Sequence, residues 1–271
     1  KQDYRKMKNI FIIGAGLSAS SLLRYLTDHS TEQGWQLRVC DQDEAKAKQR
    51  VNGCKNAEGF GLDALNPELR KEHIIWADLV ISMLPARFHV EIAKDCIQYK
   101  TDLLTPSYIS DEMKALHEEA VQAGIIIMNE IGVDPGLDHM SAKRILDHID
   151  LIGGKMHIFE SFTGGLVAPE SDNNPWNYKF TWNPRNVVLA GQGSAAKFIQ
   201  EGKYKYIPYT RLFRRTEIIH IGDYGYFEGY ANRDSLKYRD IYDLHDIPTI
   251  YRGTLRRKGF SRSWDAFVQL G

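Results

Sequence analysis

The sequence has little cysteine, no excess of charge of either sign and no long apolar run, and each shortage argues against a class of protein. Its three cysteines, Cys40, Cys54 and Cys96, form no CxxC pair and are odd in number, which disfavours a disulfide framework or a structural zinc site. Lys plus Arg and Asp plus Glu are equal at 35 each, so we expect no nucleic-acid partner. The basic run at 256–259 is interpreted as solvated surface.

Several targeting and catalytic signals are also missing. No apolar stretch reaches the ~18 residues of a membrane span, and the start lacks the apolar core of a signal peptide. HExxH and GxSxG are absent, so we expect neither a bound metal nor serine hydrolysis. We therefore expect no membrane partner and a reducing, cytoplasmic location. Residues 1–6 precede the first Met and are interpreted as a tag or as part of a longer parent.

The first motif present is a glycine-rich turn between a strand and a helix. "NIFII" at 9–13 reads as a buried strand, "GAGLSA" follows at 14–19, and "SSLLRYL" then has helical periodicity. Gly14 permits the tight turn, and Gly16 lets a pyrophosphate approach the backbone and the positive helix N-terminus. Ala19 takes the third small position. This context predicts a dinucleotide site.

An acidic residue stands where the adenosine ribose is expected. The second strand, "QLRVC", ends at residue 40, and Asp41 follows it. A carboxylate there accepts both ribose hydroxyls of NAD but repels the 2′-phosphate of NADP. The nearby cations Lys46 and Lys48 are expected on the next helix, facing solvent. We predict that NAD is preferred over NADP.

A second match to the same pattern, "GQGSAA" at 191–196, lacks this context. It follows the apolar "VVLA", but "RLFRR" stands about where the distant acid should be. We expect an ordinary helix there, with no cofactor.

Alternating strands and helices continue to about residue 131. Strands are predicted at 77–84, 101–108 and 125–131, with helices at 88–99 and 110–123, the last capped by Ser110. This order predicts a Rossmann-type, doubly wound parallel sheet in a dinucleotide-binding domain over 1–135. Ligands of such sheets bind beyond the carboxyl ends of the strands. The expected cofactor contacts are Gly14, Gly16, Leu17, Ser18, Asp41, Gln42, Met83, Leu84, Ser107 and Val133.

"GVDPGLDH" at 132–139 follows one of these strand ends and holds more ionisable groups than a turn needs. It reads either as a capped turn before a helix from Gly136 or as a site of chemistry, and its place beside the expected nicotinamide favours the second. Asp134 is then a candidate catalytic residue. His139 could act as a base, but we expect it to cap or pack.

From about residue 153 the sequence becomes rich in glycine, aromatics and alternating strands, which predicts an α+β domain over 136–271 with a mainly antiparallel sheet. Polar, aperiodic segments at 164–182, 230–238 and 251–260 are candidate binding loops.

These three segments, together with "SYIS" and "NEIGVDPGLDHM", resemble the saccharopine reductases from about Lys8 to Gly271. These are the glutamate-forming saccharopine dehydrogenases, which include the dehydrogenase half of bifunctional aminoadipic semialdehyde synthase. Thr163 stands where the family often has cysteine. Family members are longer, so we expect a truncated second domain, and activity of this chain alone stays open.

The resemblance implies an NAD(P)-dependent oxidoreductase of lysine metabolism. It would oxidise saccharopine to an imine that is hydrolysed to L-glutamate and 2-aminoadipate 6-semialdehyde. Such a reaction needs an acid/base group, and the three substrate carboxylates call for arginine forks. The implied catalytic residues are Asp134 and Tyr108. The implied saccharopine-binding residues are Ser107, Tyr108, Asp134, Arg233, Thr254, Leu255 and Arg256.

Alternatives remain at this point. Either arginine could instead form a structural salt bridge, and Asn174 and Lys179 are further polar candidates. A polyamine enzyme of the carboxynorspermidine dehydrogenase type is similar only in the nucleotide half. A catalytically incompetent dinucleotide-binding fragment, serving assembly or regulation, is a third reading. The reaction direction is open, a homodimer is allowed, and a mitochondrial location applies if the chain belongs to a eukaryotic bifunctional enzyme.

Overall fold

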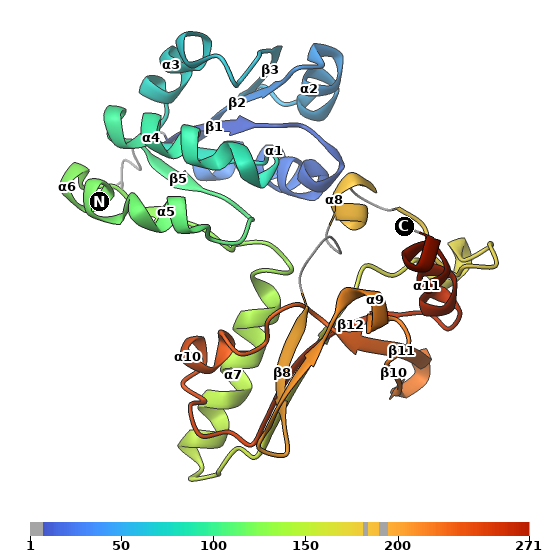
Figure 1. The fold of residues 1–271 in the computed structure, drawn as a ribbon. Coiled ribbons are helices and arrows are strands. Elements are labelled where there is room, and N and C mark those ends of the chain that lie inside the picture. Colours follow the sequence, from blue (N-terminus) through green and yellow to red (C-terminus); the bar gives the residue numbers. More distant parts are fainter. Residues whose placement is uncertain (1–7, 181–183, 190–194, 271) are drawn as a thin grey trace. The chain divides into compact units, whose positions relative to one another are not determined.

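The computed structural model describes residues 8–180, 184–189 and 195–270. The chain forms two compact units, one ending at Leu137 and the other beginning at Asp138, each with its own sheet (Figure 1). No described helix combines the length and the hydropathy that a membrane crossing requires.

The first unit is a six-stranded parallel sheet in the order β3-β2-β1-β4-β5-β6, with helices along the chain between the strands. This confirms the predicted Rossmann-type architecture. Its strands are β1 (Lys8–Ile13), β2 (Trp35–Asp41), β3 (Ala57–Gly61), β4 (Leu79–Ser82), β5 (Asp102–Leu104) and β6 (Ile127–Met128). Its helices are α1 (Ser20–Gln33), α2 (Glu44–Val51), α3 (Pro67–Trp76), α4 (His89–Tyr99), α5 (Asp111–Ala115) and α6 (His117–Ala123), with short 3-10 turns η1 (Leu17–Ala19) and η2 (Ala86–Phe88).

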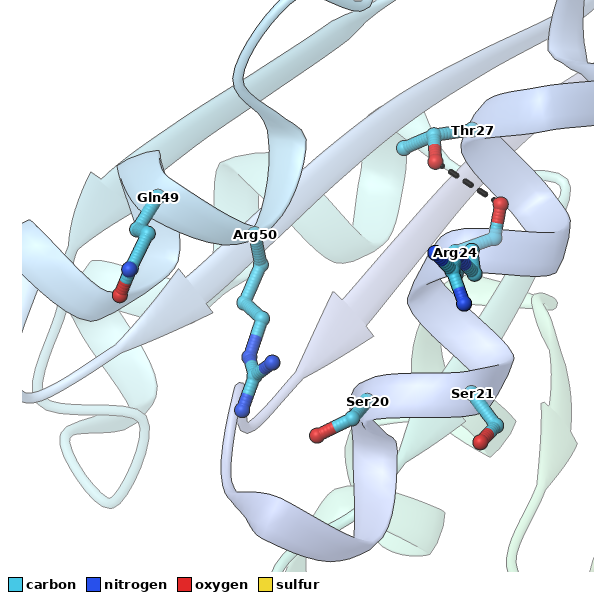
Figure 2. A pocket seen from close by; sticks show the side chains of 6 residues that line it. All are labelled: Ser20, Ser21, Arg24, Thr27, Gln49 and Arg50. Carbon is cyan, nitrogen blue, oxygen red and sulfur yellow. Dashed lines mark hydrogen bonds between the residues drawn. The ribbon is translucent and has the colours of Figure 1, made fainter.

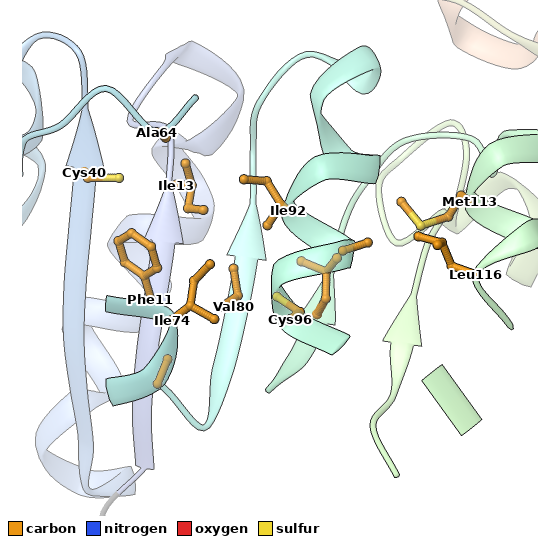
Figure 3. Packing of buried hydrophobic residues seen from close by; sticks show 13 residues of the cluster. Phe11, Ile13, Cys40, Ala64, Ile74, Val80, Ile92, Cys96, Met113 and Leu116 are labelled. Carbon is orange, nitrogen blue, oxygen red and sulfur yellow. The ribbon is translucent and has the colours of Figure 1, made fainter. Parts of the chain in front are cut away.

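Both faces of this sheet are buried, which explains why β1 is apolar without alternation. Ile10 and Ile12 point to one face and pack in a cluster with residues of α1 and α2. Phe11 and Ile13 point to the other face, where they pack with residues of α3 and α4 such as Ile74, Ile92 and Cys96 (Figure 3). The apolar run therefore buries β1 in the middle of the sheet, between β2 and β4, and the glycine-rich turn follows at its carboxyl end.

Some predicted boundaries were too long. The strand predicted at 101–108 covers only Asp102–Leu104, because Pro106 has no N–H to continue the ladder. The strand predicted at 125–131 shortens to Ile127–Met128. The helix predicted at 110–123 is broken at Leu116 into α5 and α6, although Ser110 does cap it by accepting a hydrogen bond from Met113 N at 3.1 Å.

The second unit has a mainly antiparallel sheet in the order β10-β11-β12-β8-β9, and β7 pairs with β12 in parallel. The predicted antiparallel α+β architecture is thus confirmed. Its strands are β7 (Ile158–Thr163), β8 (Ala196–Gln200), β9 (Lys203–Ile207), β10 (Thr216–Ile221), β11 (Gly225–Ala231) and β12 (Thr249–Arg256). Its helices are α7 (Leu137–Leu151), α8 (Pro184–Leu189), α9 (Tyr209–Leu212), α10 (Tyr238–Ile241) and α11 (Phe260–Leu270), with 3-10 turns η3 (Pro169–Ser171) and η4 (Gly222–Tyr224).

The helix predicted for the second glycine pattern is not borne out where it can be followed. Residues 191–194 lie outside the described part of the chain, and Ala196 begins strand β8. Strand β8 continues through Lys197, Phe198 and Ile199 and pairs antiparallel with β9. The small residues at the end of the pattern therefore lead into a hairpin and not into a helix.

Candidate functional site

The glycine-rich turn joins β1 to η1 and α1 at the carboxyl edge of the parallel sheet. Gly14 has φ +106°, and a Cβ there would lie 3.2 Å from the carbonyl oxygen of Met83, so only glycine fits without strain. A Cβ on Gly16 would meet no atom within 4 Å, so no contact inside the protein requires glycine at that position. Leu17 is 70% exposed and Ser18 is exposed as well. The open backbone before a helix start fits a pyrophosphate.

Asp41, the last residue of β2, faces this turn. Its Oδ2 accepts a hydrogen bond from Ala15 N at 2.9 Å, and its Oδ1 accepts one from Asp43 N at 3.0 Å. The Lys46 ammonium lies 3.9 Å from Oδ1. Lys46 is exposed on α2, as expected, although its ammonium also reaches the end of β2. The carboxylate is held in place beside the expected ribose.

A cavity of about 220 Å³ opens beside Asp41. Gln42 and Leu84, two of the predicted cofactor contacts, line it together with Gly14 and Asp41. Sequence reasoning missed its apolar walls, because most of them lie in loops without periodicity. These walls come from Leu62, Ala64, Leu65, Pro85 and Phe88. A mostly apolar slot next to a carboxylate suits a flat aromatic base attached to a ribose.

A second cavity of about 410 Å³ lies between α1 and α2. Figure 2 shows Arg50 reaching from α2 toward the start of α1, and its Nε donates a hydrogen bond to Ala15 O at 3.4 Å. The lining consists of Ser20, Ser21, Arg24, Thr27, Gln49 and Arg50. No sequence pattern indicates that an arginine approaches the glycine-rich turn, since Arg50 lies near the end of the next helix.

Two predicted catalytic residues meet directly at the ends of neighbouring strands. Tyr108, in the loop after β5, donates a hydrogen bond from its hydroxyl to Asp134 Oδ1 at 2.5 Å. The two loops are further tied together, because Ile109 N donates to Glu130 Oε1 at 2.9 Å and Glu130 N donates to Ser107 O at 3.0 Å. Glu130 was not predicted. The phenol and the carboxylate therefore form one exposed hydrogen-bonded pair, and further hydrogen bonds hold together the two loops that carry them.

The loop that carries Asp134 is closed on itself. Gly132 N donates to Pro135 O at 2.8 Å, and Leu137 N donates to Gly132 O at 3.0 Å. Gly136 has φ +148°, and a Cβ there would collide with the backbone of Gly132. The Asp134–Pro135 peptide is cis, and Val133, a predicted cofactor contact, is 71% exposed. The loop thus leaves the side chains of Val133 and Asp134 exposed.

A buried histidine, which the sequence did not single out, connects the ends of β4 and β5. His89 Nδ1 lies 2.9 Å from Ser82 Oγ, and its Nε2 lies 2.8 Å from Ser107 Oγ. Burial lowers the pKa of His89 to about 4, so the ring is neutral. Ser107 was a predicted contact of both cofactor and substrate.

The remaining predicted substrate residues lie in the second unit. Thr254, Leu255 and Arg256 end β12, and Gly164 closes against the carbonyl of Leu255 so tightly that a side chain would collide. The Arg256 guanidinium lies about 5 Å from the rings of Tyr178 (5.1 Å) and Phe260 (5.0 Å).

The hydrogen bonds of Arg256 leave its Nε without a partner in the described residues. Its Nη1 donates to Leu255 O at 3.0 Å, while its Nε is buried with no hydrogen-bond partner in the described residues. Arg233 follows β11 and has φ +41°, and its carbonyl accepts from Lys197 N at 2.7 Å. Neither arginine takes part in an ion pair within the described chain, so the salt-bridge alternative finds no support there.

Other polar candidates are engaged inside the second unit. His139 Nδ1 lies 2.6 Å from the Tyr242 hydroxyl, and its ring stacks on Tyr238, as expected for a packing role. Asn174 bonds its own loop through Tyr178 O and Trp176 N, at 2.9 and 3.0 Å. Lys179 is half-buried.

Comparisons with known proteins agree with this architecture. Residues 10–128 match the saccharopine dehydrogenase NADP binding domain, and residues 132–271 match the saccharopine dehydrogenase C-terminal domain. Saccharopine dehydrogenase [NADP(+), L-glutamate-forming] of Schizosaccharomyces pombe is 36% identical over 98% of this chain and 58% of its own length. Alpha-aminoadipic semialdehyde synthase of Arabidopsis thaliana is 34% identical over the whole chain but only 27% of its own length.

A solved structure is similar as well. The apo, histidine-tagged saccharopine dehydrogenase (L-Glu forming) from Saccharomyces cerevisiae superposes with a TM-score of 0.85 at 35% identity, covering 94% of this chain and 56% of that one. The chain therefore spans little more than half of the length of these two saccharopine dehydrogenases. With both domain families matched along nearly all of its length, the chain belongs to the saccharopine dehydrogenase family.

Proposed function

We propose that this chain forms the cofactor-binding and substrate-binding parts of an L-glutamate-forming saccharopine dehydrogenase. The reaction converts saccharopine to an imine, whose hydrolysis gives L-glutamate and 2-aminoadipate 6-semialdehyde. The observation that carries the proposal is the 2.5 Å hydrogen bond between Tyr108 and Asp134 at the carboxyl edge of a dinucleotide-binding sheet. The names of the matched relatives support the choice of substrate.

The Tyr108–Asp134 pair suits the proton transfers of this reaction. The secondary amine of saccharopine is protonated near neutral pH, and it must lose that proton before the neighbouring carbon can release hydride. When bound, the nicotinamide accepts that hydride. The Asp134 carboxylate can take the ammonium proton, and the Tyr108 hydroxyl keeps the carboxylate oriented. Once Asp134 has passed that proton to solvent, its carboxylate can remove a proton from the water that attacks the imine.

The substrate carboxylates need cationic partners, and Arg233 and Arg256 are our candidates. The buried Nε of Arg256, which has no hydrogen-bond partner among the described residues, supports this role, since a buried donor left unsatisfied costs about 1–3 kcal/mol. The flanking rings of Tyr178 and Phe260 hold the guanidinium plane in place. Thr254 and Leu255 would add backbone or hydroxyl contacts.

For the cofactor, we propose that NAD binds more tightly than NADP. Asp41 is fixed by two backbone N–H groups and faces the expected ribose. Two like charges about 4 Å apart cost about 4 kcal/mol at an effective dielectric near 20. Lys46 and Arg50 act against this preference, and two of the matched relatives, those of Schizosaccharomyces pombe and Saccharomyces cerevisiae, carry NADP(+) in their names.

The direct test is saccharopine-dependent formation of reduced nicotinamide, followed by absorbance, with glutamate as the second product. The full-length protein should turn over saccharopine and leave carboxynorspermidine untouched. If the protein binds the dinucleotide but forms no reduced cofactor with either substrate, the enzyme assignment is rejected and the chain is a binding module.

A further inference from the structure

The ends of β4 and β5 are joined by a chain of three side chains, Ser82, His89 and Ser107. Ser82 closes β4 and is fully buried, and His89 opens α4 with 3% of its surface exposed. Ser107 is half-buried in the loop after β5. The two ring nitrogens of His89 contact the two hydroxyls at 2.9 and 2.8 Å. The histidine thus bridges the buried sheet and the proposed site.

The direction of the hydrogen bonds in this chain follows from counting donors and acceptors. A neutral imidazole carries one N–H donor and one acceptor nitrogen. The Ser82 hydroxyl has no described partner other than His89 Nδ1, so its proton is satisfied only if it points to that nitrogen. The opposite arrangement would leave a fully buried hydroxyl proton without an acceptor. Nδ1 is therefore the acceptor, and the ring proton sits on Nε2.

This tautomer sets the polarity of Ser107. His89 Nε2–H donates to Ser107 Oγ, so the Ser107 hydroxyl proton must point elsewhere. The backbone around it is fixed, because Ser107 N donates to Thr105 Oγ1 at 3.1 Å and Ser107 O accepts from Glu130 N at 3.0 Å. No described residue accepts the Ser107 hydroxyl proton. The Ser107 hydroxyl proton can therefore be donated to a ligand bound beyond the strand ends.

We propose that His89 is a positioning residue that turns the Ser107 hydroxyl into an oriented hydrogen-bond donor for a ligand oxygen. The acceptor is a carbonyl or carboxylate oxygen, supplied either by the carboxamide of the cofactor or by a carboxylate of the substrate. The inference rests on the proposed function only in placing Ser107 at the ligand. The tautomer itself is a property of the free protein.

Two substitutions of His89 separate its two hydrogen bonds. His89→Gln keeps an N–H donor near the position of Nε2, and His89→Asn keeps a group near Nδ1 but loses the reach to Ser107. Ser107→Ala removes the oriented donor itself. We expect Ser107→Ala and His89→Asn to weaken the same step, by about threefold to tenfold for a carboxamide acceptor and about tenfold or more for a carboxylate. His89→Gln should recover most of the loss.

The readouts identify the acceptor. Titrating dinucleotide into each variant reports the carboxamide, and the KM for saccharopine reports the carboxylate. The double variant His89→Asn/Ser107→Ala should be no weaker than Ser107→Ala alone, since the two changes remove one interaction. If His89→Asn and His89→Gln lower the unfolding midpoint equally while the dissociation constant and KM stay at wild-type values, His89 only fills space and the inference is overturned.

Nitrogen NMR of the histidine rings in the free protein gives an independent result. The His89 resonances, assigned by comparison with His89→Gln, should show the proton on Nε2 from neutral pH down to about pH 5. A proton on Nδ1 would refute the inference. Absent saccharopine turnover in the wild-type protein would count against the proposed function alone, because the NMR and dinucleotide measurements do not depend on it.

Discussion

The Tyr108 hydroxyl donates to the Asp134 carboxylate over 2.5 Å, across 26 positions of the chain. The bond joins the loops that follow β5 and β6, and both residues are exposed. A phenol held against a carboxylate at an exposed strand end contributes little to folding, because water can replace it. Its value must lie in the orientation of the two groups.

The first prediction concerns this pair. Asp134→Asn should lower kcat for saccharopine by about 100-fold or more, since the amide cannot take a proton. Tyr108→Phe should have a smaller effect, because the carboxylate remains. Steady-state kinetics with an unfolding curve for each variant test this, and the near-isosteric changes should leave the unfolding midpoint in place. Unchanged turnover in Asp134→Asn would make Asp134 a turn residue only.

The second prediction concerns the choice between NAD and NADP. We expect at least tenfold tighter binding of NAD, and a smaller ratio in Asp41→Ser, whose hydroxyl can still accept the Ala15 N–H. Removing the cation Arg50, as Arg50→Gln, should weaken NADP more than NAD. Calorimetric titration of both dinucleotides measures the two ratios. Equal affinity of the wild-type protein for NAD and NADP would defeat the preference.

The third prediction separates the two candidate substrate arginines. Arg233→Ala should raise KM for saccharopine by about tenfold to a hundredfold, as expected for a lost bond to a charged group. Arg256→Ala should do the same and also lower stability by about 1 kcal/mol, because the guanidinium packs over Tyr178 and Phe260. Dinucleotide affinity serves as the control. A parallel loss of cofactor affinity would point to general destabilisation instead.

The fourth prediction is the pH dependence of stability that His89 creates. Burial lowers its pKa to about 4 in the folded state, from 6.5 when unfolded, so the unfolded chain binds the proton more readily between these values. The free energy of unfolding therefore falls as the pH drops from about 6.5 toward 4, because protons then favour the unfolded chain. The total loss from His89 is about 3 kcal/mol, and none of it is felt above about pH 6.5.

His89→Gln removes this titration and isolates its effect. The stability difference between wild type and variant should shrink as the pH drops from 7 to 4.5, as measured by denaturant unfolding at each pH. Burial also lowers the pKa of His73, but that residue is present in both proteins and cancels in the difference. A difference that stays constant over this range would contradict the buried neutral state.

Local patterns predicted the parts of the fold that local interactions determine. The strand before Gly14, the turn and α1 follow from one apolar run and two glycines. Strand β3 escaped prediction because "AEGFG" has no apolar run. Its Gly59 is required by the backbone of α2, where a Cβ would lie 2.5 Å from Ala47 O. That constraint exists only after the helix has packed.

The candidate site likewise contains residues that the local sequence indicates and residues that only tertiary contacts reveal. Asp134 stood out because it follows a strand end, and Tyr108 through the family resemblance, but their mutual hydrogen bond depends on the order of β5 and β6 in the sheet. His89 gave no signal, since a single histidine at a helix start has many ordinary explanations. Arg50 reaches the glycine-rich turn only because α2 lies beside α1. Such residues become visible through tertiary contacts alone.

Gly16 and Gly136 differ in whether the fold itself tolerates a side chain at that position. At Gly16 a side chain meets nothing in the protein, whereas at Gly136 it collides with the backbone of Gly132. In a library of all single substitutions, we expect position 136 to admit glycine alone when variants are scored for soluble expression. Position 16 should tolerate most residues in that screen and lose them in a second screen for dinucleotide capture. One glycine is then preserved by architecture and the other by the ligand.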